Sequence, residues 1–213
     1  SRPGRYASVC ASTPTLGVAN PMPQFLPLLT RPETRVMIFV DRENLALRYK
    51  AELQDALPSN HVFYMPDVMV WSPYASRQKG PEEYVRRYYY TSVPGDESAR
   101  LQVEQRLREA GIEAPRVFRR DKNGRSKQVD ITLTTEMLTH AHRDNFDIAV
   151  LVSGDGDYVP LVEAVKAEGK RVAIWSLTSG LSPRLKLSAD HFWNIGELLF
   201  REGANQAFLN IYD

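Results

Sequence analysis

The sequence predicts an α/β domain with three layers, in which helices cover both faces of a mainly parallel central sheet. Three segments are short and largely apolar, which is typical of strands that are buried on both faces: 36–40, 148–152 and 171–176. They alternate with helix-like segments of about 10–15 residues, and strands that alternate with helices of that length form parallel sheets. Sheets of this kind bind their ligands at the carboxyl ends of the strands.

Prolines and composition set the predicted boundaries in the first half of the domain. A helix over 44–57 follows the first strand and stops at Pro58, because proline cannot continue a helix. Residues 59–82 contain several Pro and Gly residues and predict a loop-rich insertion with a strand near 68–71. The segment 84–91 is rich in aromatic residues and therefore has the composition of a strand.

The second half of the domain continues the same alternation. Gly111 and Gly169 each follow a predicted helix, as glycine often does. The elements expected here are a helix over 97–110, a strand over 116–119, a helix over 130–143, the strand 148–152, a helix over 158–168, the strand 171–176, and short helices over 181–187 and 195–201.

Residues 1–35 differ from the rest of the chain. They contain six of the 14 prolines and one acidic residue, Glu33. The proline spacing excludes a regular helix, so we expect a Pro-rich N-terminal arm over 1–35 and one compact domain over 36–213. The arm contains Arg and Ser, but it lacks clear amphipathic periodicity, so we favour an arm over a targeting peptide. We expect a cytoplasmic location.

Composition excludes several classes of protein without selecting a function. No apolar run is long enough to span a bilayer. The single cysteine, Cys10, excludes an internal disulfide framework and a Cys-rich zinc site. The 27 Lys and Arg residues balance 26 Asp and Glu residues, so the whole protein is not attracted to nucleic acid or membranes by its net charge.

Acidic residues follow two of the predicted strands. Asp41 comes directly after the strand 36–40, and Asp155 and Asp157 follow the strand 148–152. Asp130 opens the next predicted helix and joins them if that helix begins at the same edge of the sheet. Carboxylates in one crevice repel one another unless a cation neutralises them, and Mg²⁺ and Mn²⁺ prefer oxygen ligands.

Each of these carboxylates also has a structural interpretation. Asp41 has the position of a helix N-cap, and Asp130 that of a first-turn charge favoured by the helix dipole. Asp155 and Asp157 fit a turn or cap pair. The pattern alone leaves both interpretations open.

Three ordered motifs resemble those of NYN domains, a PIN-like nuclease family that includes LabA-type proteins. Ile38–Leu45 resembles the opening strand-Asp-x-x-Asn-Leu motif, Lys127–Leu133 the K-x-V-D-x-x-L motif, and Leu151–Leu161 the L-V-S-G-D-x-D-F-x-P-L motif. The resemblance covers about residues 36–200. It implies a PIN-like, Rossmann-like fold and a nuclease that requires Mg²⁺ or Mn²⁺ and most often acts on RNA.

The resemblance also implies roles for single residues. The acidic core of the family matches Asp41, Asp130 and Asp155, and a nearby fourth carboxylate matches Asp157. Asn44 matches the polar residue that holds the first Asp or a metal-bound water. We therefore expect the four carboxylates to bind the metal and, with Asn44, to form the catalytic set.

Other positions either match or depart from the family pattern. Ser153 matches the serine beside the acidic pair and is expected to contact the substrate. The residue after Asp41 is usually Gly and is Arg42 here, so its long side chain is expected either to block the site or to contact a phosphate. Glu136 stands where Asp is more common, and we interpret it as a supporting group at the rim.

A basic stretch over 115–127 runs into Asp130 and carries a net charge of +5. Such a stretch binds phosphates in a salt-dependent way, although many charge runs are simply solvated loops. The expected substrate-binding residues are Arg119, Arg120, Lys122, Arg125 and Lys127, together with Arg42 and Ser153.

A second segment that suits nucleic acid is the Tyr-rich strand. Regular alternation places Tyr84, Arg86, Tyr88 and Tyr90 on one face. Aromatic and Arg side chains can stack on bases, but Tyr-rich strands are more often part of a core, which is the favoured interpretation.

The leading hypothesis is a metal-dependent endoribonuclease that acts on single-stranded or structured RNA. One alternative is an RNA-binding or regulatory module with weak or no catalysis, for which Arg42 is the best argument. Another is a metal-dependent phosphatase. No membrane partner is expected, and a homodimer formed through the apolar residues of the arm is left open.

Overall fold

The computed structural model describes residues 34–76, 82–120 and 127–201. Most of the predicted arm lies outside these residues, so the arm and its boundary stay predictions. No helix in the described part of the chain is long and apolar enough to cross a membrane.

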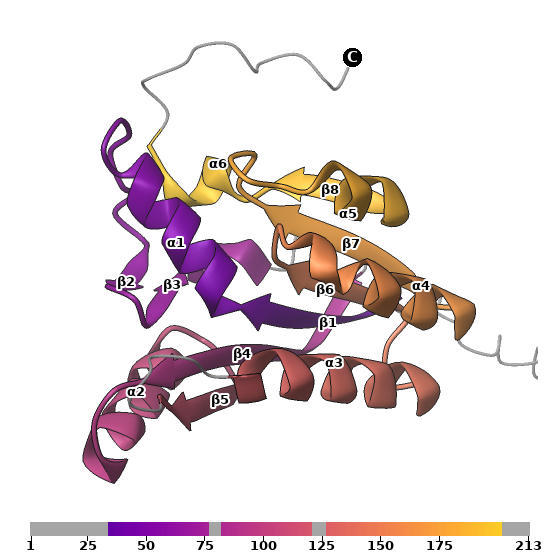
Figure 1. The fold of residues 1–213 in the computed structure, drawn as a ribbon, viewed down its shortest axis with the longest axis horizontal. Helices are drawn as coiled ribbons and strands as arrows, with labels where there is room; N and C mark the ends of the chain where they lie inside the picture. The colour runs from indigo at the N-terminus through magenta and orange to yellow at the C-terminus, as the bar shows by residue number, and fades with distance from the viewer. Residues whose placement is uncertain (1–33, 77–81, 121–126, 202–213) are drawn as a thin grey trace, which may run out of the picture. The chain divides into compact units, whose positions relative to one another are not determined.

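The central sheet contains six strands that all pair in parallel (Figure 1). They are β1 (Thr34–Asp41), β4 (Glu82–Val93), β5 (Ala114–Arg119), β6 (Ile148–Val152), β7 (Arg171–Ser176) and β8 (His191–Asn194). Their spatial order is β5-β4-β1-β6-β7-β8. The chain therefore builds outward from β1 to β5, returns to the other side of β1 and continues to β8. The carboxyl ends of β1 and β6 flank this reversal, which is where open α/β sheets form their ligand crevice.

Helices cover both faces of the sheet, which confirms the predicted three-layer fold. One hydrophobic cluster joins the sheet to α1 (Arg42–Glu52), α2 (Glu97–Glu109) and α6 (Gly196–Leu199). The other joins it to α3 (Lys127–His142), α4 (Val159–Ala167) and α5 (Pro183–Ser188). Strand β1 contributes to both clusters, because successive side chains of a strand point to opposite faces. This explains why its sequence is continuously apolar.

The segment predicted as a loop-rich insertion contains regular structure. Strands β2 (Phe63–Met65) and β3 (Met69–Trp71) form an antiparallel hairpin, and the 3-10 helix η1 (Pro73–Ser76) follows. Strand β3 confirms the strand predicted near 68–71, whereas β2 and β8 are not predicted. Strand β8 has four residues, none of them fully buried. Short strands at the margin of a fold lack the apolar run that identifies central strands.

Strand β4 corrects the predicted faces of the Tyr-rich segment. The pairing with β1 shifts by one residue, so that Val36 pairs with Tyr84 but Met37 pairs with Arg86. Tyr84 therefore packs on the face of Tyr89, whereas Tyr88 and Tyr90 face the other way. A bulge reverses the alternation of side chains beyond it.

The same strand also settles the role of these tyrosines. Tyr88, Tyr89 and Tyr90 are no more than 2% exposed, so their rings belong to the core and are not available to stack on bases.

The core also predicts where the fold is most sensitive to mutation. Phe39 is fully buried and stacks on Tyr88, with ring centroids 5.3 Å apart. Phe39→Ala should lower the free energy of unfolding by about 3–5 kcal/mol, because the cavity it leaves cannot be filled. Urea denaturation measures this change. Leu187→Ala, at a side chain that is 85% exposed, should change it by less than about 0.5 kcal/mol, and equal effects of the two variants would contradict the assignment of the core.

Candidate functional site

The site is centred on Asp41, the last residue of β1. Its side chain is 3% exposed. The Ser153 hydroxyl donates a hydrogen bond to Oδ2 at 3.0 Å, and the backbone N–H of Glu43 donates to Oδ1 at 3.0 Å. The second bond makes Asp41 the N-cap of α1. The structural interpretation of this residue therefore holds, and both oxygens of its carboxylate accept a hydrogen bond from the protein.

Burial changes the protonation of Asp41. Loss of hydration raises the pKa of this carboxyl to about 7, because the charged form is poorly solvated there. The hydrogen bond from Ser153 opposes the shift, and the negative charge of Asp130 adds to it. Asp41 is therefore poised to change its charge near neutral pH.

The turn after β6 brings a second acidic group to the same edge. Ser153 is 1% exposed, and its Oγ accepts a hydrogen bond from the backbone N–H of Asp155 at 3.2 Å. Asp155 in turn caps the 3-10 helix η2 (Gly156–Tyr158) by accepting from the N–H of Asp157 at 3.0 Å. Asp155 and Asp157 are both exposed, so their remaining oxygens face solvent.

Asn44 has a more structural role than the sequence suggests. Its Oδ1 accepts a hydrogen bond from the backbone N–H of Gly154 at 2.9 Å. The side chain thus ties α1 to the turn that carries Ser153 and Asp155. A β-carbon on Gly154 would lie 2.9 Å from Ser176 Oγ and 3.2 Å from Asn44 Oδ1, which explains the glycine in the centre of the motif.

Asp130 lies in the first turn of α3. The Tyr158 hydroxyl donates to its Oδ1 at 3.3 Å. Loss of hydration raises the pKa of Asp130, this hydrogen bond lowers it, and the charges of Glu43, Asp155 and Asp157 raise it further. The carboxylates predicted from the sequence therefore act on one another in one region of the fold.

Two side chains in this region are absent from the predicted set. Glu43 is exposed on the first turn of α1, and its charge raises the pKa of both Asp41 and Asp130. Tyr158 orients Asp130. The signal for Glu43 is its place two residues after a strand-end Asp, and that for Tyr158 is its place directly after Asp157.

The carboxylates of the described residues do not form a complete metal site. Within residues 34–76, 82–120 and 127–201, no three His, Cys, Asp or Glu side chains are arranged so that they could hold a metal ion. The electrostatic interactions of Asp41 and Asp130 with their acidic neighbours place these groups in one neighbourhood.

Arg42 is buried rather than extended into solvent, since it is 7% exposed and its Nη2 donates to Ser92 Oγ at 3.0 Å. It therefore points toward the carboxyl end of β4. Its expected role at a phosphate stays a prediction.

The predicted basic stretch divides into residues with different surroundings. Arg119 is exposed at the end of β5, and Arg120 donates to Ser92 Oγ at 3.2 Å. Arg116 instead donates to the Glu136 carboxylate at 2.9 Å, which also accepts from Tyr90. Glu136 is therefore tied to the sheet. Lys122 and Arg125 lie outside the described residues, as does the side chain of Lys127.

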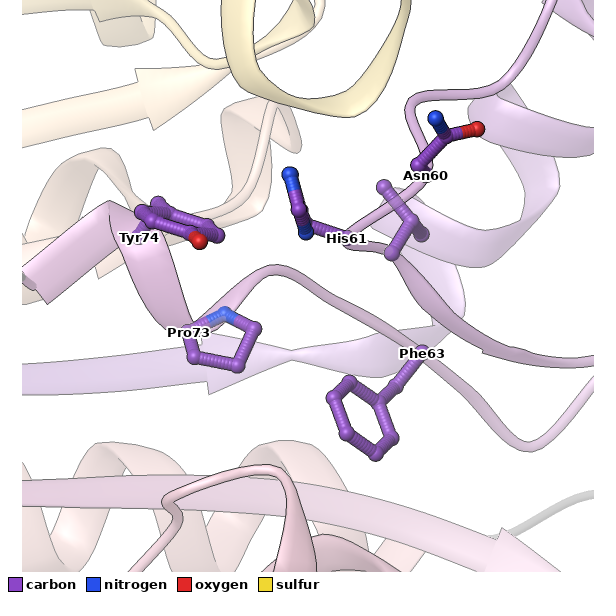
Figure 2. A pocket seen from close by; sticks show the side chains of 6 residues that line it. Asn60, His61, Phe63, Pro73 and Tyr74 are labelled. Atoms are coloured by element: carbon purple, nitrogen blue, oxygen red, sulfur yellow. The ribbon is translucent and has the colours of Figure 1, made fainter.

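A cavity of about 400 Å³ lies away from the predicted site residues. Figure 2 shows its labelled side chains around an open hollow, in which the rings of His61 and Tyr74 are 4.6 Å apart. It is lined by Asn60, His61, Val62, Phe63, Pro73 and Tyr74. None of these is a carboxylate, so we place the candidate site at the strand ends and not here.

Comparison with known proteins decides the family. The model of the NYN domain family matches residues 35–196. The chain belongs to the NYN domain family. Its fold is accordingly a PIN-like, nuclease-type fold.

One solved structure supports the fold of this NYN domain. It is a protein of unknown function from Vibrio parahaemolyticus, with 24% sequence identity and a TM-score of 0.60, covering 81% of this chain and 99% of that one. A second structure, that of Sa239, has 10% identity and a TM-score of 0.35, and covers 76% of this chain and 60% of that one. The second similarity is too low to support any argument. No curated protein matches the sequence.

The burial of Asp41 in this NYN domain predicts a pH-dependent stability. Its pKa in the folded state, about 7, lies above its ordinary value of 3.8, so folding favours the protonated form. The stability that this group contributes should therefore be lost as the pH rises from about 4 to 7. In EDTA, Asp41→Asn should gain on the order of 1 kcal/mol or more relative to wild type between pH 4.5 and pH 8. A difference in unfolding free energy that is independent of pH would contradict this.

The close packing of Gly154 predicts a second effect. Gly154→Ala should lower the free energy of unfolding by about 1–3 kcal/mol, because the added methyl group overlaps Ser176 and the bond to Asn44. Thermal denaturation measures this. Gly111→Ala is the comparison. A β-carbon at Gly111 meets no atom within 4 Å, so only the strain of the positive φ of 85° opposes that substitution. If Gly154→Ala had wild-type stability, the turn would not be packed as described.

Proposed function

We propose that this NYN domain is a divalent-metal-dependent nuclease that hydrolyses phosphodiester bonds, and that its substrate is RNA. The observation that carries the proposal is the mutual repulsion of carboxylates at the end of β1, in the turn after β6 and in the first turn of α3. Asp41 and Asp130 each have a pKa raised by burial and by neighbouring negative charge. A structural cap or turn needs one of these charges, whereas a cation site needs several.

The donor chemistry fits Mg²⁺ or Mn²⁺. The groups that interact with one another here are all carboxylates, whose oxygens hard divalent cations prefer. We propose that Asp41, Asp130, Asp155 and Asp157 hold the ion, and the exposed Glu43 is a further candidate. When bound, such an ion polarises a phosphodiester and lowers the pKa of water.

The remaining side chains orient these carboxylates. Ser153 fixes one oxygen of Asp41, and Tyr158 fixes one oxygen of Asp130. Asn44 holds the turn that carries Asp155. Such supporting contacts typically change metal affinity or activity by about 10–100-fold when they are removed.

We further propose that the basic stretch binds the phosphate backbone of the RNA. Arg119 is exposed at the carboxyl end of β5, two strands away from β1 in the sheet. Positive charge near an acidic metal site holds the substrate where the carboxylates alone would repel it. The other proposed members are Arg120, Lys122, Arg125 and Lys127.

A second function is an RNA-binding module with weak or no turnover. Its basis is Arg42, which stands after Asp41 where the family usually has Gly. RNA binding that does not change on addition of metal, with no cleavage, would support that alternative.

Cleavage assays test the leading proposal. Single-stranded and hairpin RNA should be cut in Mn²⁺ or Mg²⁺ and not in EDTA, and Asp155→Asn should reduce the rate by about 100-fold or more. Asp55→Asn is a matched control, because Asp55 is exposed in the turn after α1. Metal-dependent cleavage that persists in Asp155→Asn would exclude this site. Rapid turnover of small phosphate esters, with RNA left intact, would indicate a phosphatase.

A further inference from the structure

Two arginines converge on one serine at the edge of the sheet. Arg42 Nη2 donates to Ser92 Oγ at 3.0 Å, and Arg120 Nε donates to the same oxygen at 3.2 Å. Arg42 comes from the start of α1, Ser92 lies near the end of β4, and Arg120 follows β5. Like charges repel, so two guanidinium groups on one neutral acceptor call for an explanation.

The acceptors around this pair do not balance its charge. Arg120 Nη2 donates to the backbone carbonyls of Ser92 and Asp67. Neither Arg42 nor Arg120 forms an ion pair with a carboxylate in the described part of the chain. Arginine stays protonated in proteins, so two positive charges are held here by neutral groups.

Arg42 also keeps an unused donor. Its side chain is 7% exposed, and its Nε is buried with no hydrogen-bond partner. A buried donor without a partner costs about 1–3 kcal/mol, and more when the group is charged. Burial and the charge of Arg120 both lower the pKa of Arg42. An anion bound beside the pair would relieve the repulsion between the two guanidinium groups.

The pair lies next to the carboxylates. Arg42 directly follows Asp41, and its charge interacts with Asp41 and Glu43. Ser92 and Arg120 stand at the carboxyl ends of β4 and β5, on the opposite side of β1 from the turn after β6. An anion bound here would therefore sit at the same edge as the carboxylates, displaced toward β5.

We propose that Arg42, Ser92 and Arg120 form a subsite for a backbone phosphate of a polynucleotide that extends from the carboxylates toward β5. Arg120, which is partly exposed, contacts the phosphate, and Arg42 is a positioning residue whose buried charge strengthens that contact. Guanidinium groups match the geometry of phosphate oxygens. The substrate is then a chain with several phosphates and not a small phosphate ester. The proposed nuclease function supplies the position of the reacting bond, but binding at the subsite does not require cleavage.

Binding measured without metal tests the subsite. A fluorescent single-stranded RNA of about 12 nucleotides is titrated with the full chain in EDTA at several salt concentrations. Arg120→Gln should weaken binding about 10-fold at low salt and reduce the slope of log affinity against log salt by about 1. Arg171→Gln is the matched control, because Arg171 is exposed at the start of β7, on the opposite edge. It should leave both quantities unchanged.

A second pair of variants examines the buried arginine. Arg42→Gln should lower the affinity and the salt slope, and Arg42→Lys should recover most of the slope because it keeps the charge. Melting temperatures check that both variants fold. If Arg42→Gln does not fold, Ser92→Ala takes its place, because it removes the shared acceptor while both charges remain, and it should weaken binding with an unchanged slope.

The outcomes separate this subsite from the nuclease proposal. Wild-type affinity and slope in Arg120→Gln would overturn the subsite, even if wild-type protein cleaves RNA. Loss of binding in Arg120→Gln, with no cleavage by wild type in either metal, would uphold the subsite and refute the nuclease. Displacement of the RNA by a nucleoside monophosphate at an equal phosphate concentration would overturn the assignment to a polynucleotide.

Discussion

The hydrogen bonds of the Asp41 carboxylate organise this NYN domain. One oxygen caps α1 through Glu43, and the other accepts from Ser153 in the turn after β6. A single side chain thus joins the end of the central strand, the start of a helix and the neighbouring turn. Because β1 and β6 flank the reversal of strand order, these bonds fix the geometry at the point where the fold leaves a crevice.

The burial of Asp41 lowers the stability of the fold at the place where we propose that the chemistry occurs. Burying Asp41 with other carboxylates nearby favours its protonated form, which costs folding free energy at neutral pH. The buried cation of Arg42 is the counterpart on the other side of β1, where neutral acceptors receive two arginines. A near-neutral protein therefore contains adjacent regions of opposite local charge. Ionisable groups whose pKa is shifted by burial and by neighbouring charges are typical of functional sites.

The sequence predicts those features that depend on local order. Apolar runs identify the central strands, and strand-end residues such as Asp41 and Asp155 identify the edge at which we place the candidate site. The direction of Arg42 is not predictable, because Ser92 and Arg120 reach it only through the pairing of β4 and β5. The bulge in β4 is hidden for a similar reason, since one extra residue changes which side chains face the core without changing composition. Glu43 is missed because an exposed Glu in a first helical turn is common.

The capping bonds also give the site reporters within its own backbone. The amide of Glu43 donates to Asp41, and the amide of Gly154 donates to Asn44. The chemical shift of an amide proton depends on the charge of the oxygen that it binds, so titration of Asp41 would be visible at Glu43. The resonance of Gly154 would respond instead to movement between α1 and the turn. Nuclear magnetic resonance could therefore follow protonation and geometry at this crevice separately, without a label on any side chain.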